Sequence, residues 1–266
     1  MMLDNQDTVI GVVGGMGPEA GTDLVSLITQ LTDSTNDQEH KSVMLMSFPA
    51  YLPDRTAFLE GRVSINPAYN IAKVIQKLDK AGAGVIGIAC NTSHIPGIFD
   101  VVTEEVQALQ VEAKVLHMPY ETCEFIRKRL PIGSKVGIMS TNGTYRSGLY
   151  QQLLTEAGFS PVSPDEDFQQ NIIHELIYHP VFGLKSVNGA LMRESKEYLK
   201  RIISYFKTRG AEAIILGCTE FSLILKEPIV DGMHIINSNE VLARALIAAS
   251  DASTAGARKK AQFVQG

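Results

Sequence analysis

Two cysteines each follow a short apolar run of the chain. The run GVIGIA (84–89) ends at Cys90, and the run EAIILG (212–217) ends at Cys218. Nearly continuous apolar runs of this length are typical of strands buried on both faces of a parallel sheet. Because ligands bind beyond the carboxyl ends of parallel strands, we expect both thiols at a functional edge of a sheet.

The residues after each cysteine suggest acid/base chemistry. They are polar, CNTSH after the first run and CTEF after the second, and a helix is expected to begin there. A helix N-terminus offers free N–H groups and the positive end of a dipole, which lowers the pKa of a thiol from roughly 8.5 toward neutrality and binds carboxylates. Two such thiols could invert a carbon centre, one removing a proton and the other delivering a proton to the opposite face.

The second half of the chain repeats the first. The segment KAGAGVIGIAC (80–90) matches TRGAEAIILGC (208–218) without a gap, and TVIGVVGGMG (8–17) matches SKVGIMSTNG (134–143) at nearly the same separation. The matches pair Gly11 with Gly137 and Cys90 with Cys218. They indicate a duplicated α/β lobe.

Less specific interpretations of the cysteines remain open. A buried cysteine is often only a small apolar residue, and we interpret Cys123, which has no counterpart in the repeat, in this way. A disulfide would remove both thiols from chemistry. A zinc site of Cys90, His94 and Cys218 lacks the closely paired ligand spacing of zinc proteins. The equivalent positions of Cys90 and Cys218 favour a functional pair.

Alternating strand and helix patterns surround these residues. Helical periodicity is seen from Pro18, over 68–78 and over 199–206, with Gly82 and Gly210 ending the last two helices. The predicted strands lie at 8–13, 42–48, 84–89, 113–118, 134–139, 212–217 and 233–237. This alternation predicts an α/β fold of two pseudo-symmetric lobes, each a small, mostly parallel sheet flanked by helices, with an active site in the interlobe cleft.

The same pattern predicts the domain boundaries. We expect a first lobe of residues 1–116 plus 231–252, whose final helix near 238–250 packs back on that lobe. The second lobe is expected to span 117–230. Residues 253–266 are small, polar and basic, and we expect them to form a flexible tail.

Composition excludes several classes of partner. The chain has 266 residues, 45% of them hydrophobic and 20% charged, and a net charge of -5. This charge argues against nucleic acid as a partner, and a mean hydropathy of +0.05 without a long apolar run argues against a membrane. The first residues lack the basic and apolar pattern of a signal peptide, so we expect a cytoplasmic protein with reduced thiols.

Several motifs together resemble those of the aspartate/glutamate racemase superfamily, and of its aspartate racemase branch in particular. They are GVVGGMGPEA (11–20), DQEH (37–40), PDRT (53–56), CNTSH (90–94), STNGT (140–144) and GCTE (217–220). The resemblance implies that Cys90 and Cys218 are the catalytic bases and that neither pyridoxal phosphate nor a metal is used.

The resemblance also implies a set of substrate-binding residues. The side chains expected to bind substrate are Asn91, Thr92, Thr141, Thr144 and Thr219. Met16 and Gly17 are expected to place backbone N–H groups at the site.

Two positions separate the aspartate branch from glutamate racemases. Glutamate racemases carry Asp-Ser-Gly in the first loop and a histidine after the second Cys-Thr, whereas this chain has Gly15-Met16-Gly17 and Glu220. Glu220 could orient or tune Cys218 from behind the substrate. It could equally be a carboxylate stabilised by the first turn of a helix.

Binding an acidic side chain requires cations. Arg55, in PDRT, resembles the arginine that grips the side-chain carboxylate in this family, and a guanidinium can do so bidentately. The alternative is a surface arginine paired with Asp54. Lys185, in VFGLKSVN (181–188), is the candidate for a second cation, on a segment that Gly183 would allow to move as a lid.

The favoured function is therefore a cofactor-independent racemase of a small acidic amino acid, aspartate, which by resemblance forms a homodimer. One alternative is a glutamate or broad-specificity racemase, an epimerase or a decarboxylase of the same superfamily. A further alternative is a non-catalytic two-lobe protein that binds acidic amino acids, although this gives no reason for paired cysteines.

Overall fold

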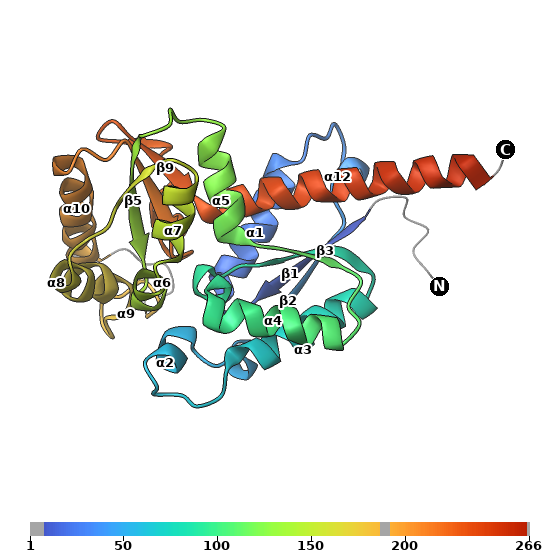
Figure 1. The fold of residues 1–266 in the computed structure, drawn as a ribbon, viewed down its shortest axis with the longest axis horizontal. Helices are drawn as coiled ribbons and strands as arrows, with labels where there is room; N and C mark the ends of the chain where they lie inside the picture. Colours follow the sequence, from blue (N-terminus) through green and yellow to red (C-terminus); the bar gives the residue numbers. More distant parts are fainter. Residues whose placement is uncertain (1–7, 187–191, 265–266) are drawn as a thin grey trace.

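The computed structural model describes residues 8–186 and 192–264, with side chains up to residue 254. Two separate sheets and their covering helices form the molecule (Figure 1). Within the described part of the chain, no helix is long and apolar enough to span a membrane.

The first sheet is parallel throughout, in the order β2-β1-β3-β4. Its strands are β1 (Val9–Gly14), β2 (Val43–Ser47), β3 (Ala83–Ile88) and β4 (Lys114–Leu116). One face packs against α3 (Pro67–Lys80) and α4 (Pro96–Ala108), and the other against α1 (Pro18–Leu31) and α12 (Ser238–Val264). The central strands β1 and β3 are therefore buried on both faces, which explains their unbroken apolar sequences.

The second sheet has the order β6-β5-β7-β9-β8, and β8 (Ile229–Val230) is its antiparallel edge strand. The parallel strands are β5 (Lys135–Ser140), β6 (Ser160–Val162), β7 (Ala213–Gly217) and β9 (Met233–Asn237). One face packs on α10 (Arg193–Thr208), the π-helix η4 (Gln169–His174) and α9 (Glu175–Tyr178). The other packs on α5 (Met118–Arg127) and α7 (Leu149–Glu156).

The two sheets have equivalent topologies, which confirms the predicted pseudo-symmetry. Strands β2, β1, β3 and β4 correspond in order to β6, β5, β7 and β9. The matched glycines serve close packing in both lobes. A Cβ added at Gly11 would lie 3.0 Å from Ala83 Cβ, and one added at Gly137 would lie 2.6 Å from the Phe206 ring.

The C-terminal region connects the lobes. Strand β9, within the segment 231–252 predicted for the first lobe, pairs with β7 in the second sheet. Helix α12 then runs back along α1 and β3 of the first lobe (Figure 1). Where a flexible tail was predicted from residue 253, the helix continues to Val264, and the Thr254 hydroxyl accepts a hydrogen bond of 3.0 Å from Thr8 N. The division into lobes stays a prediction.

Short helices complete the edge of each sheet at which the site lies. In the first lobe they are η2 (Pro49–Tyr51), α2 (Arg55–Leu59) and η3 (Asn91–His94), whereas η1 (Asp37–Glu39) precedes β2 at the opposite edge. In the second lobe they are α6 (Asn142–Ser147), α8 (Glu166–Phe168) and α11 (Phe221–Ile224).

Candidate active site

Both repeat cysteines line one small buried cavity between the lobes. Cys90 directly precedes η3 of the first lobe, and Cys218 follows β7 of the second. Both thiols are free and about 5% exposed or less. The residues that line the cavity are Met16, Arg55, Thr56, Cys90, Asn91, Thr92, Thr141, Tyr178, Lys185, Cys218, Thr219 and Glu220. Ten of the twelve predicted site residues thus meet in one place.

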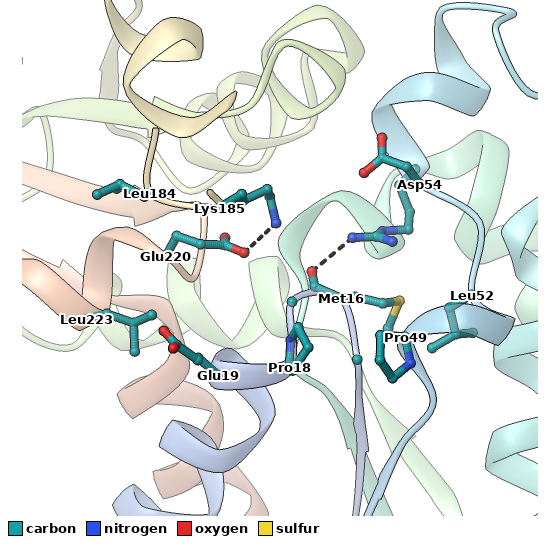
Figure 2. A pocket seen from close by; sticks show the side chains of 13 residues that line it. Met16, Pro18, Glu19, Pro49, Leu52, Asp54, Leu184, Lys185, Glu220 and Leu223 are labelled. Carbon is teal, nitrogen blue, oxygen red and sulfur yellow. Dashed lines mark hydrogen bonds and ion pairs between the residues drawn. The ribbon is translucent and has the colours of Figure 1, made fainter. Parts of the chain in front are cut away.

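The other two predicted residues lie beside the cavity. Thr144 lies behind Thr92, a residue that lines the cavity, and the two Oγ1 atoms are 3.1 Å apart. Gly17 lines a larger pocket of about 570 Å³ that opens to the outside (Figure 2).

Four residues line both the cavity and the outer pocket: Met16, Arg55, Lys185 and Glu220. Figure 2 shows the Lys185 ammonium directed at Glu220. Arg55 Nη2 donates to Met16 O. These residues form the boundary between the buried thiols and the exterior.

A cation stands beside the thiol of the first lobe. Arg55 Nη2 donates to Met16 O at 2.9 Å and Nη1 donates to Pro53 O at 3.1 Å, while its buried Nε has no partner within residues 8–186 and 192–264. Burial lowers the pKa of Arg55, but interactions with Cys90 and Asp54 outweigh it and the pKa is raised. The guanidinium therefore stays charged next to Cys90 and retains one donor for a ligand.

An anion stands beside the thiol of the second lobe. Cys218 Sγ donates to Glu220 Oε2 at 2.9 Å. Burial and the charge of Glu220 raise the pKa of Cys218 well above its usual value. The expectation that a helix N-terminus lowers the pKa is therefore wrong for Cys218. Helix α11, which follows Glu220, has only four residues, and the carboxylate and the low-polarity surroundings dominate.

Glu220 is held ionised by Lys185. The Lys185 ammonium forms an ion pair with Glu220 Oε1. Burial raises the pKa of Glu220, but the charge of Lys185 and the hydrogen bond from Cys218 outweigh it, and the pKa is lowered. The resting second-lobe triplet is therefore an ammonium, a carboxylate and a neutral thiol.

The segment that carries Lys185 is tied to the end of α9. Gly183 N donates to His179 O at 2.8 Å, and Lys185 N donates to Ile177 O at 3.1 Å. A Cβ at Gly183 would lie 2.4 Å from His179 backbone atoms, so close packing explains this glycine. Close packing at Gly183 positions Lys185 in this conformation, and the lid movement stays a prediction.

The polar residues after Cys90 contact the second lobe and the start of α12. Asn91 Oδ1 accepts from the Tyr150 hydroxyl at 2.6 Å, and its Nδ2 donates to Ser238 Oγ at 3.0 Å. Thr92 Oγ1 lies 3.0 Å from Thr141 Oγ1. These contacts join η3 of the first lobe to α7, α12 and the start of α6.

Two lining residues were missed by the sequence analysis. Thr56 follows Arg55 in the PDRT motif, and that position was the available signal. Tyr178 lies in α9, which has no counterpart in the repeat, and nothing in the sequence distinguished it. Its hydroxyl lies 3.2 Å from Thr56 Oγ1 and 3.4 Å from Asp54 Oδ2, so it connects the lobes at the cavity.

His94 supports Cys90 from behind and does not line the cavity. Its Nδ1 donates to Cys90 O at 2.9 Å, and its buried Nε2 has no partner among the residues with described side chains. Burial lowers the pKa of His94 to about 3, so the ring is neutral. Over the same residues, no group of three His, Cys, Asp or Glu side chains could hold a metal ion.

Fold and site together define a two-lobed α/β protein with a pair of thiols, one from each lobe, in a buried interlobe cavity that also contains cations. The chain belongs to the Asp/Glu/hydantoin racemase family, whose model matches residues 13–246.

Similar proteins share the whole fold. The chain is 26% identical to the broad specificity amino-acid racemase RacX of Bacillus subtilis (strain 168), over 90% of this chain and 96% of that protein. The structure of Picrophilus torridus aspartate racemase matches with a TM-score of 0.75 and 28% identity, over 92% of this chain and 94% of that one. An aspartate racemase homologue from Pyrococcus horikoshii OT3 has a TM-score of 0.67 at 23% identity, over 92% and 99% of the two chains.

Proposed function

We propose that the protein is an amino-acid racemase that interconverts L- and D-aspartate, with Cys90 and Cys218 as its two acid/base groups. The observation that carries the proposal is that two thiols from opposite lobes line the same buried cavity. One thiolate removes the Cα proton, and the other cysteine, as thiol, delivers a proton to the opposite face. Two thiols suffice for these transfers, so the proposal includes no cofactor.

The charges around the cavity support an acidic substrate. Arg55 and Lys185 are both cations, and among the described residues Glu220 is the only acidic side chain lining the cavity. A substrate with two carboxylates offsets this excess of positive charge. Arg55, with its free Nε donor, and Lys185 would bind the carboxylates.

Threonine and backbone groups complete the proposed binding site. Thr92, Thr141 and Thr219 line the cavity and supply hydroxyl groups, with Thr144 behind them. Asn91 would hold the segment after Cys90 in position, and Met16 and Gly17 would form the entrance. These dipoles would stabilise the negative charge that develops as the Cα proton leaves.

Substrate entry requires the lobes to separate. The inner cavity has a volume of about 10 Å³, which is the space of roughly one water molecule. The described conformation is therefore the closed one, and aspartate would enter from the outer pocket as the boundary residues move.

A broad-specificity or glutamate racemase is the second candidate, and similarity to RacX favours it. A decarboxylase would leave one of the two thiols without a role, and a non-catalytic binding protein would leave both without one. The homodimer stays a prediction based on the resemblance, and the cytoplasmic location stays a prediction based on the sequence of the first residues.

Single replacements of the cysteines test the proposal. Cys90→Ala and Cys218→Ala should each lower racemisation of aspartate by about 10²–10⁴-fold, because one face of Cα loses its acid/base group. Cys123→Ala, at a buried cysteine outside the cavity, is the control and should stay active. Chiral chromatography measures racemisation, and deuterium incorporation at Cα across a panel of amino acids identifies the substrate. Substantial turnover by either single variant contradicts the two-base mechanism.

A further inference from the structure

The Lys185–Glu220 ion pair closes the boundary between the outer pocket and the thiol cavity. Both residues line both spaces. Glu220 also abuts the first lobe, because a Cβ added at Gly17 would lie 3.1 Å from its Oε1. In Figure 2 the Lys185 ammonium points directly at this carboxylate. A substrate that reaches the thiols must pass this pair.

The two oxygens of Glu220 have different partners. Oε1 pairs with the Lys185 ammonium, and Oε2 accepts the hydrogen bond from Cys218 Sγ. The carboxylate therefore connects the cation at the entrance to the thiol in the cavity. Moving Lys185 changes the charge environment of the group that holds the Cys218 proton.

We propose that an arriving substrate carboxylate draws Lys185 away from Glu220, and that the released Glu220 then accepts the proton of Cys218. This assignment rests on the proposed function and deepens it. Lys185 is a gate opened by an anionic side chain, and Glu220 is the proton acceptor that makes Cys218 a base. An amino acid without a second carboxylate leaves the pair closed and Cys218 protonated. The movement of Lys185 would therefore both select acidic substrates and convert Cys218 into a base.

The proton transfers balance. The Cys218 S–H bond breaks as Glu220 Oε2 gains the proton, and the thiolate then takes the Cα proton of the substrate. The Cys90 thiol gives its proton to the opposite face, which leaves a thiolate beside Arg55. On product release Lys185 returns to Glu220, whose proton leaves to solvent, and Cys90 regains a proton from solvent.

The surrounding charges favour this order of events. The charge of Lys185 holds the pKa of Glu220 down against burial, so the pKa rises when Lys185 leaves. Burial and then the charge of Glu220 raise the pKa of Cys218, while the charge of Lys185 lowers it. The effect of Glu220 disappears once that carboxylate is neutral. The other groups that face this cluster are Tyr178, whose burial raises its pKa so that it stays a phenol, and the Arg55 cation.

Thiolate absorbance in the ultraviolet tests the gate without requiring turnover. The probe is succinate, a dicarboxylate with no amine, added to the full-length Cys90→Ala variant at pH 7. Cys218 and Cys123 are then the only thiols, and burial raises the pKa of Cys123 to about 12. Succinate should raise the signal toward one thiolate per chain, whereas propionate, with one carboxylate, should not.

Matched carboxylate replacements identify the proton acceptor. In the Cys90→Ala background, Glu220→Gln should abolish the succinate-induced signal, whereas Glu19→Gln, on the outer pocket, should keep it. In the otherwise unchanged enzyme, Glu220→Gln should lower kcat by about 10²–10⁴-fold. It should also move the rising limb of the pH–rate profile to higher pH, because Cys218 must then lose its proton to solvent.

Calorimetric measurement of succinate binding distinguishes failure of the gate from failure of the proposed function. Bound succinate without a thiolate signal, or an equal signal in the Glu220→Gln variant or with propionate, overturns the gate and leaves the two-cysteine racemase intact. Absence of succinate binding contradicts the preference for dicarboxylates in the proposed function, and the gate with it.

Discussion

The two thiols are chemically different although the repeat makes them equivalent. Cys90 lies beside the Arg55 cation, and Cys218 donates to the Glu220 carboxylate. In the proposed mechanism one cysteine is a thiolate and the other a thiol while the Cα proton moves, and the hydrogen bond to Glu220 keeps Cys218 protonated until substrate arrives. The difference between the lobes is carried by neighbouring charged residues.

The sequence predicted the residue types of the site but not their pairing. The cysteines, threonines and Arg55 were found because motifs and the repeat place them at strand ends. The ion pair joins Lys185 to Glu220 across 35 positions of the chain, and it forms only because the segment after α9 folds back on that helix. No local pattern specifies such a contact, and the same holds for Tyr178.

Arg55 should bind substrate through its fork of donors. In Arg55→Lys the charge remains, but the single ammonium nitrogen cannot reproduce the planar fork, in which Nη1 and Nη2 hold Pro53 O and Met16 O while Nε stays free for a carboxylate. Loss of one charged hydrogen bond, about 1.5–3 kcal/mol, corresponds to roughly a 10–100-fold rise in KM for aspartate. Steady-state kinetics measures it. The exposed Arg62→Lys, which changes a pair with Glu60, serves as control and should keep its KM. An unchanged KM in the Arg55 variant removes Arg55 from the binding site.

At the scale of elements, the strands and the larger helices could be predicted because their periodicity is local. The edge strand β8 has two residues and the π-helix η4 depends on packing under β5 and α10, so neither has a distinct sequence signal. The short helix η3 is specified by its surroundings. Its four residues, Asn91–His94, are all buried between the lobes.

A chain of histidine hydrogen bonds anchors η3. His94 Nδ1 donates to Cys90 O, and His117 Nε2 donates to His94 O at 3.1 Å. His117 Nδ1 in turn accepts from Tyr120 N at 3.2 Å, at the start of α5. The loop that carries Cys90 is thereby attached to the first helix after the interlobe connection. The bond from Tyr120 N requires a neutral His117, and burial keeps His94 neutral.

Acidification should therefore lower the stability of the protein, because buried His94 resists protonation. Its pKa in the folded protein is about 3, against 6.5 for an ordinary histidine. Between these values the unfolded chain binds a proton that the folded chain does not. The free energy of unfolding should decrease by about 1.4 kcal/mol per pH unit, or about 2 kcal/mol by pH 5. Above pH 6.5 this contribution is fully present.

Urea unfolding of the wild type and of His94→Asn between pH 8 and pH 4.5 measures this effect. The difference in stability at pH 8 reports lost packing and serves as the internal control. The variant should lose less stability than the wild type as the pH falls, because the contribution of His94 is absent. Parallel pH dependences in the two proteins would show that His94 does not resist protonation.

At the scale of the whole molecule, the site exists only where the lobes meet. The duplicated topology was predictable from two matched segments, because equivalent strands carry equivalent sequences. The interlobe contacts were not. Asn91 meets Tyr150 of α7 and Thr92 meets Thr141 before α6, at separations of 59 and 49 residues. Such contacts depend on the relative orientation of the two sheets, and no short sequence motif specifies that orientation.

Tyr150 should therefore couple stability to activity. Its hydroxyl, on a fully buried side chain of the second lobe, donates to Asn91 Oδ1, directly after Cys90. Tyr150→Phe leaves that oxygen buried without its donor, which should cost about 1–3 kcal/mol of unfolding free energy. It should also lower kcat for aspartate by displacing Cys90.

Tyr145→Phe is the matched control. The hydrogen bond that it loses is to Pro164 O within the same lobe and is partly exposed, so water can replace the hydroxyl, and the unfolding free energy and kcat should both change less. Urea unfolding and racemisation rates of the two variants decide the point: equal effects would mean that the interlobe hydrogen bond does not position the thiol.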